Sequence, residues 1–130
     1  MTYSDYNKRN KYNATKQTGF DKLRYDSTLE RDMADILYWL VVSGEMLKYQ
    51  AKPPAVEFPC GIRWKVDFWC VDINGAGYYL ETKGFATRDY GMKLRCFKHH
   101  KPAPLLVYGR KGSHWYIMES ENAGEIERPI

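Results

Sequence analysis

Long apolar runs are missing from this sequence of 130 residues. A membrane-spanning helix needs about 20 consecutive apolar residues, and no stretch of that kind occurs in the chain. The opening residues are polar and lack the apolar core of a signal peptide. We therefore expect a protein that contacts no membrane and acts in the cytoplasm.

Cysteine is also scarce. The three cysteines, Cys60, Cys70 and Cys96, form no Cys-x-x-Cys pair, and their odd number does not suit a framework of disulfides. Such usage is typical of proteins in reducing compartments. We expect three free thiols, with Cys60 and Cys70 serving as small core residues.

Acidic residues are few in the first 24 positions, where only Asp5 and Asp21 occur. The same segment carries six basic residues, Lys8, Arg9, Lys11, Lys16, Lys22 and Arg24. The rest of the chain carries equal numbers of basic and acidic residues. Within it, the segment from Glu119 onward is acidic. We expect a flexible basic arm at 1–24, one domain at 25–118 and an acidic tail at 119–130. A basic arm indicates a polyanionic partner.

What the sequence does contain is a hairpin pattern between Trp64 and Gly84. Ile62–Asp72 alternates apolar and polar residues, as a half-buried strand does. Asn74-Gly75 is a strong signal for a tight turn between antiparallel strands. Tyr78–Lys83 then forms the returning strand.

Chemically active side chains lie on both strands of this hairpin. Residues two apart on a strand share a face, so Glu81 and Lys83 point one way and Thr82 points to the core. The turn brings Asp67 across from Glu81 and Lys83. Two carboxylates suit Mg²⁺ or Mn²⁺, with the backbone carbonyl of Thr82 as a further ligand. Such a site can hydrolyse phosphodiesters, with Lys83 orienting water or holding phosphate. Taken alone, Glu-Thr-Lys is more typical of a solvated surface ion pair than of a metal site.

A helix precedes the hairpin. Ser27-Thr28-Leu29-Glu30 has the pattern of a capping box, and apolar residues recur at spacings of three and four as far as Val41. Gly44 provides a left-handed stop. The pattern predicts a helix of roughly 16 residues.

The remaining segments complete a mixed domain. We predict an edge segment at Leu47–Gln50, a helix from Thr87 to about His100, and strands at Val56–Phe58, Leu105–Tyr108 and His114–Met118. A helix connects the Tyr78–Lys83 and Leu105–Tyr108 strands, which favours their parallel pairing. The fold class is α/β (α+β), with a mixed sheet of four to five strands flanked by helices.

Asp67 followed by Glu81-Thr82-Lys83 resembles the signature of the PD-(D/E)XK nucleases, the restriction-endonuclease-like superfamily. Val66 stands where that signature has proline. Tyr25–Glu30 and Leu80–Phe85 are similar to phage junction-resolving endonuclease I, and Asn10–Lys16 looks like the start of a related small phage family. The resemblance covers Lys11 to about Tyr108.

The resemblance implies a restriction-endonuclease-like core and a Mg²⁺-dependent DNA endonuclease of phage type. Glu30, Asp67 and Glu81 would hold one or two Mg²⁺ or Mn²⁺ ions, and Lys83 would assist the attacking water. The implied substrate is branched DNA such as the four-way (Holliday) junction. Two cuts per junction imply a homodimer, and no organic cofactor is expected.

Two alternatives remain open. One is a nicking or sequence-specific phage nuclease for genome processing or degradation of host DNA. The other is a non-catalytic member that binds DNA or a host protein. In each case that involves DNA, the expected contacts are the six basic residues of the arm, together with Arg88 and Lys93.

Overall fold

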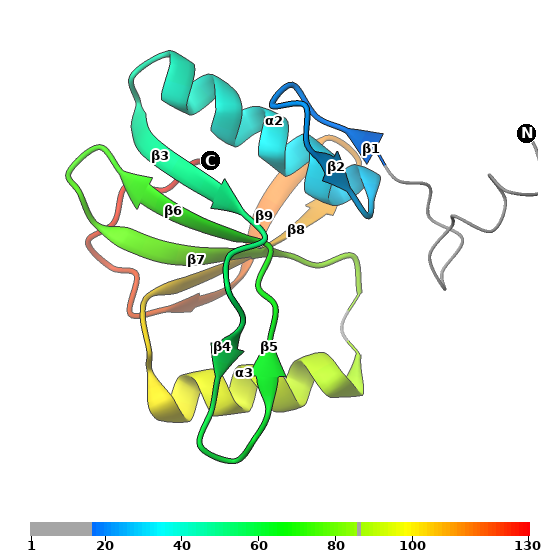
Figure 1. Cartoon of the computed structure of the whole chain (residues 1–130), viewed down its shortest axis with the longest axis vertical. Helices are drawn as coiled ribbons and strands as arrows, with labels where there is room; N and C mark the ends of the chain where they lie inside the picture. Colours follow the sequence, from blue (N-terminus) through cyan, green and yellow to red (C-terminus); the bar gives the residue numbers. More distant parts are fainter. Residues whose placement is uncertain (1–16, 86) are drawn as a thin grey trace, which may run out of the picture.

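The computed structural model describes residues 17–85 and 87–130 of the chain. Its elements are β1 (Gln17–Thr18), β2 (Arg24–Tyr25), α2 (Thr28–Val42), β3 (Met46–Ala51), β4 (Val56–Glu57), β5 (Arg63–Trp64), β6 (Phe68–Asp72), β7 (Gly77–Thr82), α3 (Arg88–His100), β8 (Leu105–Lys111) and β9 (His114–Glu121). Five of these strands form one sheet in the order β3-β6-β7-β8-β9 (Figure 1). Strands β7 and β8 pair in parallel and the other neighbours pair antiparallel. The predicted mixed sheet flanked by helices is confirmed.

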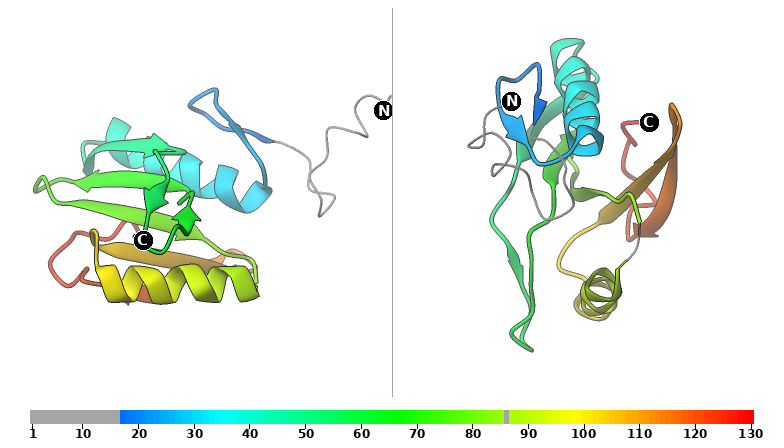
Figure 2. Two further views of the ribbon diagram at one scale, coloured as in Figure 1. Left: turned by 60° about the horizontal axis from the view of Figure 1, so that its bottom comes forward. Right: turned by 90° about the vertical axis from the view of Figure 1, so that its right-hand side faces the viewer.

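The sheet lies between two layers. Helix α2 covers one face, and helix α3 covers the other together with the small hairpin of β4 and β5 (Figure 2). Strand β7 serves both cores, because Tyr78 and Leu80 pack on the α2 side and Tyr79 packs on the α3 side. By this alternation Glu81 faces the α3 layer.

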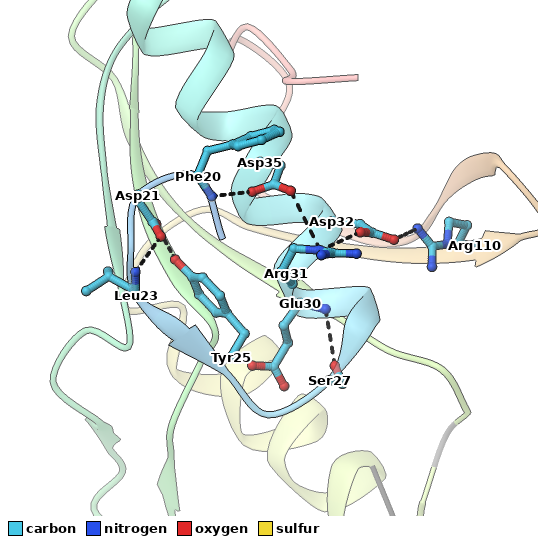
Figure 3. Close-up of polar contacts among 10 residues, drawn as sticks. All are labelled: Phe20, Asp21, Leu23, Tyr25, Ser27, Glu30, Arg31, Asp32, Asp35 and Arg110. Atoms are coloured by element: carbon cyan, nitrogen blue, oxygen red, sulfur yellow. Dashed lines mark hydrogen bonds and ion pairs between the residues drawn. The ribbon is translucent and has the colours of Figure 1, made fainter. Parts of the chain in front are cut away.

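Helix α2 begins and ends where the sequence predicts. The Ser27 hydroxyl accepts a hydrogen bond from the Glu30 N–H at 3.1 Å, and Gly44 follows the helix with a φ of +81°. Met33 and Leu37 are buried against the sheet. Figure 3 shows Arg110 of β8 reaching Asp32 of α2, at a distance of 2.5 Å between charged atoms. Local capping and this ion pair together fix the start of the helix relative to β8.

The Asn74-Gly75 turn is also confirmed, since β6 and β7 pair antiparallel around it. Asp72 stabilises the turn, because its Oδ1 atom accepts hydrogen bonds from the N–H groups of Asn74 and Ala76 at 2.9 and 2.8 Å. Gly75 has a φ of +88°, a conformation that glycine adopts readily.

The predicted continuous strand Ile62–Asp72 is wrong. Strand β5 pairs with β4 in a separate two-stranded sheet, so the chain must turn before β6 joins the main sheet. As a result Trp64 and Val66 pack in the α3 layer while Phe68 packs under α2. The alternation predicted which residues are buried, but it missed this change of face.

Residues 17–25 and 119–130 belong to the folded structure. Strands β1 and β2 pair with one another, and β9 continues to Glu121, three residues beyond the predicted strand end at Met118. The N–H of Glu127 donates to Asp72 Oδ2 at 2.9 Å, and the Tyr108 hydroxyl donates to the Ile130 carbonyl at 3.1 Å. The acidic segment is therefore packed back onto the sheet. Residues 1–16 of the predicted arm lie outside the described part of the chain.

The predicted core role of cysteine holds for one residue and is wrong for another. Cys70 is buried in the α2 layer, whereas Cys60 is exposed at the tip of the β4–β5 hairpin. The hairpin projects away from the main sheet (Figure 1). One side of its turn is therefore open to solvent. No described helix is long and apolar enough to span a membrane.

Candidate functional site

Asp67 and Glu81 meet at the point where the ladder between β6 and β7 ends. The last backbone pair of that ladder joins Phe68 to Leu80, and beyond it side chains replace the backbone partners. The Asp67 N–H donates to Glu81 Oε1 at 3.0 Å. The N–H and hydroxyl of Thr82 each donate to Asp67 Oδ2 at 2.8 Å. These reciprocal bonds hold the two carboxyl groups side by side.

The environment of this pair disfavours two negative charges. Burial raises the pKa of Asp67 well above its ordinary value of 3.8, and the charge of Glu81 raises it further. Burial also raises the pKa of Glu81, although Lys83 acts in the opposite direction. Carboxyl groups in this situation either retain a proton or gain a cation.

Lys83 places an ammonium group beside the pair. Its Nζ atom lies 3.4 Å from Glu81 Oε2 and 4.9 Å from the centre of the Tyr90 ring. Tyr90 comes from the first turn of α3, so the helix positions the ammonium as well as covering the sheet. One ammonium beside two acids leaves the cluster short of positive charge.

Glu30 approaches the same region from α2. Glu30 and Asp67 both line a cleft of about 470 Å³. Figure 3 shows Glu30 in the first turn of the helix, next to its capping residue Ser27, with its side chain directed away from Arg110. Burial raises the pKa of Glu30 to about 7, repulsion from Asp67 and Asp26 contributes, and Lys52 lowers it.

The donor atoms suit a hard divalent cation. Asp67, Glu81 and the Thr82 carbonyl are oxygen donors, which Mg²⁺ and Mn²⁺ prefer, and the cluster lacks the positive charge that such an ion carries. Among residues 17–85 and 87–130, however, no three His, Cys, Asp or Glu side chains gather closely enough to hold a metal ion. The set of Glu30, Asp67 and Glu81 as three metal ligands stays a prediction.

The predicted DNA contacts are scattered. Lys8, Arg9, Lys11 and Lys16 lie outside the described residues. Lys22 and Arg24 are exposed on or beside the β1–β2 hairpin, Arg88 is exposed at the start of α3, and Lys93 pairs with Asp89 at 2.9 Å. The Arg24 carbonyl accepts a hydrogen bond from Lys52 Nζ at 3.0 Å, which places β2 beside the cleft.

The sequence patterns did not predict that three further basic residues lie at the cleft. Lys52, Arg63 and Lys65 line it together with the acids. Lys65 precedes Asp67 by two positions, and this spacing could have suggested that the two share a side. Lys52 gives no local signal, because pairing of Ala51 with Phe68 brings it to the site.

Comparison with known proteins adds no assignment. No family model and no curated protein matches this sequence.

The raised pKa of Glu30 predicts the pH dependence of stability in the absence of metal. Between its ordinary value of 4.5 and about 7, the folded protein binds more protons at Glu30 than the unfolded chain does. The contribution of Glu30 to stability is therefore largest at low pH and is lost as pH rises through that window. Urea denaturation in EDTA should show this loss in the wild type and a flatter profile in Glu30→Gln. Parallel profiles would show that Glu30 titrates normally.

Proposed function

We propose that this protein is a Mg²⁺-dependent endonuclease that hydrolyses phosphodiester bonds in DNA, built on a restriction-endonuclease-like core. The supporting observation is the pairing of Asp67, which is half-buried and lines the cleft, with the buried Glu81, with Lys83 beside them at the end of a central hairpin. Buried like charges are unfavourable unless something compensates them. A purely structural role would be served as well by neutral amides, which can accept the same hydrogen bonds.

Each residue of the cluster has a distinct role in this proposal. Asp67, Glu81 and the Thr82 carbonyl hold the metal, and Glu30 is the third acid. Bound Mg²⁺ lowers the pKa of water and neutralises phosphate charge. Lys83 holds the attacking water or a phosphate oxygen, and its contact with the Tyr90 ring restricts where its ammonium can lie.

The cleft supports a polyanionic substrate. Lys52, Arg63 and Lys65 line it, and basic side chains at a groove bind phosphates through charge, without regard to base sequence. Acids and basic residues that line one cleft suit a nuclease, because the basic residues bind the DNA backbone while the acids bind the metal.

The proposed substrate is branched DNA, with the four-way junction favoured by the resemblance to phage junction-resolving enzymes. Resolution needs two cuts, so the proposed active form is a homodimer with one site in each subunit. In this proposal the protein is encoded by a phage and acts in the host cytoplasm.

A cleavage screen tests the function. The full chain is incubated with linear, nicked, flapped and four-way DNA, in Mg²⁺, in Mn²⁺ and in EDTA, and products are resolved on denaturing gels. We expect paired cuts in the four-way substrate with either metal and none in EDTA.

Other outcomes separate the alternatives. Equal cutting of linear duplex and junction would replace the resolvase with a general or sequence-specific nuclease. DNA binding without cleavage in either metal would favour a non-catalytic module. Cleavage that persists in EDTA would contradict the metal-dependent mechanism.

A further inference from the structure

Two thiols far apart in the sequence lie next to one another on the surface. Cys60 Sγ and Cys96 Sγ are 3.8 Å apart, although 36 positions separate the residues in the chain. Cys60 lies at the tip of the β4–β5 hairpin and Cys96 lies in α3. Cys60 is exposed and Cys96 is half-buried, so small molecules in solution can reach the first thiol directly.

The turn that carries Cys60 is well defined. The Gly61 N–H donates to the Phe58 carbonyl at 2.9 Å, and the Phe58 N–H donates to the Ile62 carbonyl at 2.9 Å. Pro59 and Gly61 flank Cys60, and Gly61 has a φ of +89°. Proline and a positive-φ glycine restrict the backbone on both sides of the cysteine.

Aromatic packing holds this turn against α3. The Phe58 ring lies 6.3 Å from the Phe97 ring and 5.7 Å from the His100 ring, measured between centroids. Trp64 at the other end of the hairpin lies 5.8 Å from Phe97. The two thiols are thus adjacent because the hairpin and helix share a core, and this packing gives them a high effective concentration.

We propose that Cys60 and Cys96 are a redox-active pair that hydrogen peroxide converts to a reversible disulfide, which locks the β4–β5 hairpin onto α3. The pair lies outside the candidate nuclease site, so this proposal does not depend on the proposed function.

The oxidation balances in two steps. The Cys60 thiolate attacks one peroxide oxygen, the O–O bond breaks, and hydroxide leaves and takes up a proton as water. Cys60 is then a sulfenic acid. The Cys96 sulfur attacks the Cys60 sulfur, the S–O bond breaks, and a second water leaves with the Cys96 proton. Two thiols and one peroxide give one disulfide and two waters.

The order of these steps follows from the surroundings of each sulfur. Partial burial raises the pKa of Cys96, the neighbouring Cys60 sulfur contributes, and Arg95 acts in the opposite direction. Cys60 is exposed while Cys96 is half-buried, so peroxide reaches Cys60 first, and the raised pKa of Cys96 agrees with its resolving role. Cys70 serves as an internal control, because burial raises the pKa of its thiol to about 12 and the core excludes peroxide.

The cross-link would close a loop that contains Asp67, Glu81 and Lys83. Closing a loop of this length reduces the entropy of the unfolded chain, so the disulfide should raise the melting temperature by about 5–10 °C. A reductant should reverse the change.

The test uses the full chain, reduced and then treated with hydrogen peroxide. Intact mass should fall by two hydrogen atoms, and thiol titration in denaturant should fall from three cysteines to one. Peptide mapping without reductant should join Cys60 to Cys96 within one chain. Uptake of oxygen atoms without a disulfide, a bond that includes Cys70, or disulfides only between chains would overturn the proposal.

Two variants test the assigned order. In Cys96→Ser, peroxide should leave a sulfenic acid at Cys60, which dimedone labels. In Cys60→Ser, labelling at Cys96 should be at least several-fold weaker at the same peroxide concentration. Equal labelling in both variants would overturn the order, and absence of labelling in both would overturn the peroxide chemistry. Thermal melts of both reduced variants verify that each is folded.

Discussion

Under the proposed function, replacing Glu81 with glutamine lowers the rate of metal-dependent DNA cleavage about 10³-fold and leaves the fold intact. Glutamine keeps an oxygen that can accept the Asp67 N–H, now bound by Glu81 Oε1 at 3.0 Å. It removes the charge that would hold the metal, and loss of several kcal/mol of metal stabilisation corresponds to a rate about 10³-fold lower. Cleavage of the preferred DNA in Mg²⁺, with melting temperature measured in parallel, checks both expectations.

Asp72→Asn is the matched control for this substitution. Asp72 is the buried acid at the opposite end of the same hairpin, only 1% exposed. Burial raises its pKa, but backbone hydrogen bonds from Glu127, Ala76 and Asn74 outweigh that effect and lower it. The charge of Asp72 therefore stabilises the fold, above all at pH values higher than the unfolded pKa, and the benefit is lost as pH falls through the folded value.

The two variants should thus dissociate activity from stability. Asp72→Asn should lower stability by about 1–3 kcal/mol and retain cleavage when assayed well below its melting temperature. Glu81→Gln should lose cleavage, and its stability should be unchanged or increased because repulsion of Asp67 is relieved. Destabilisation by Glu81→Gln with residual cleavage would show that the acid pair is structural.

Signals confined to a few neighbouring residues were sufficient to predict much of the fold. Ser27 and Thr87 each cap a helix through a hydroxyl that accepts an N–H three residues ahead. Asn74-Gly75 sets the hairpin, and the helix between β7 and β8 explains their parallel pairing. In each case the determinant and its effect lie close together in the chain.

Features that depend on distant pairing could not be predicted in this way. Nothing near Lys52 indicates that sheet pairing will place it beside Asp67. The docking of Glu127 on Asp72 joins residues 55 positions apart, and the packing that brings Cys60 to Cys96 depends on a hairpin folding over a helix. For the candidate site, the hairpin pattern predicted that Asp67, Glu81 and Lys83 lie together, but it did not indicate that Glu81 would be buried.

Replacing Phe97 with alanine will have the largest effect on stability among single substitutions in α3. The side chain is fully buried and packs against two parts of the structure at once, the β4–β5 hairpin and the central sheet. Its ring lies 6.3 Å from Phe58 of the β4–β5 hairpin, 5.8 Å from Trp64 and 6.1 Å from Tyr79 of the central sheet, between centroids. Truncation of a buried Phe typically costs about 3–5 kcal/mol, a large part of the roughly 5–15 kcal/mol that stabilises a domain.

Met92→Ala on the same helix is the matched control, because Met92 is 43% exposed and its loss should change stability by at most about 0.5 kcal/mol. Urea denaturation of both variants measures the difference. Loss of Phe97 should also slow oxidation of the Cys60–Cys96 pair, because the hairpin loses the ring that Phe58 packs against. A small effect of Phe97→Ala on stability would mean that Tyr90 and Leu94 hold α3 on the sheet without it, and the hairpin would then keep its position by contacts other than the shared aromatic core.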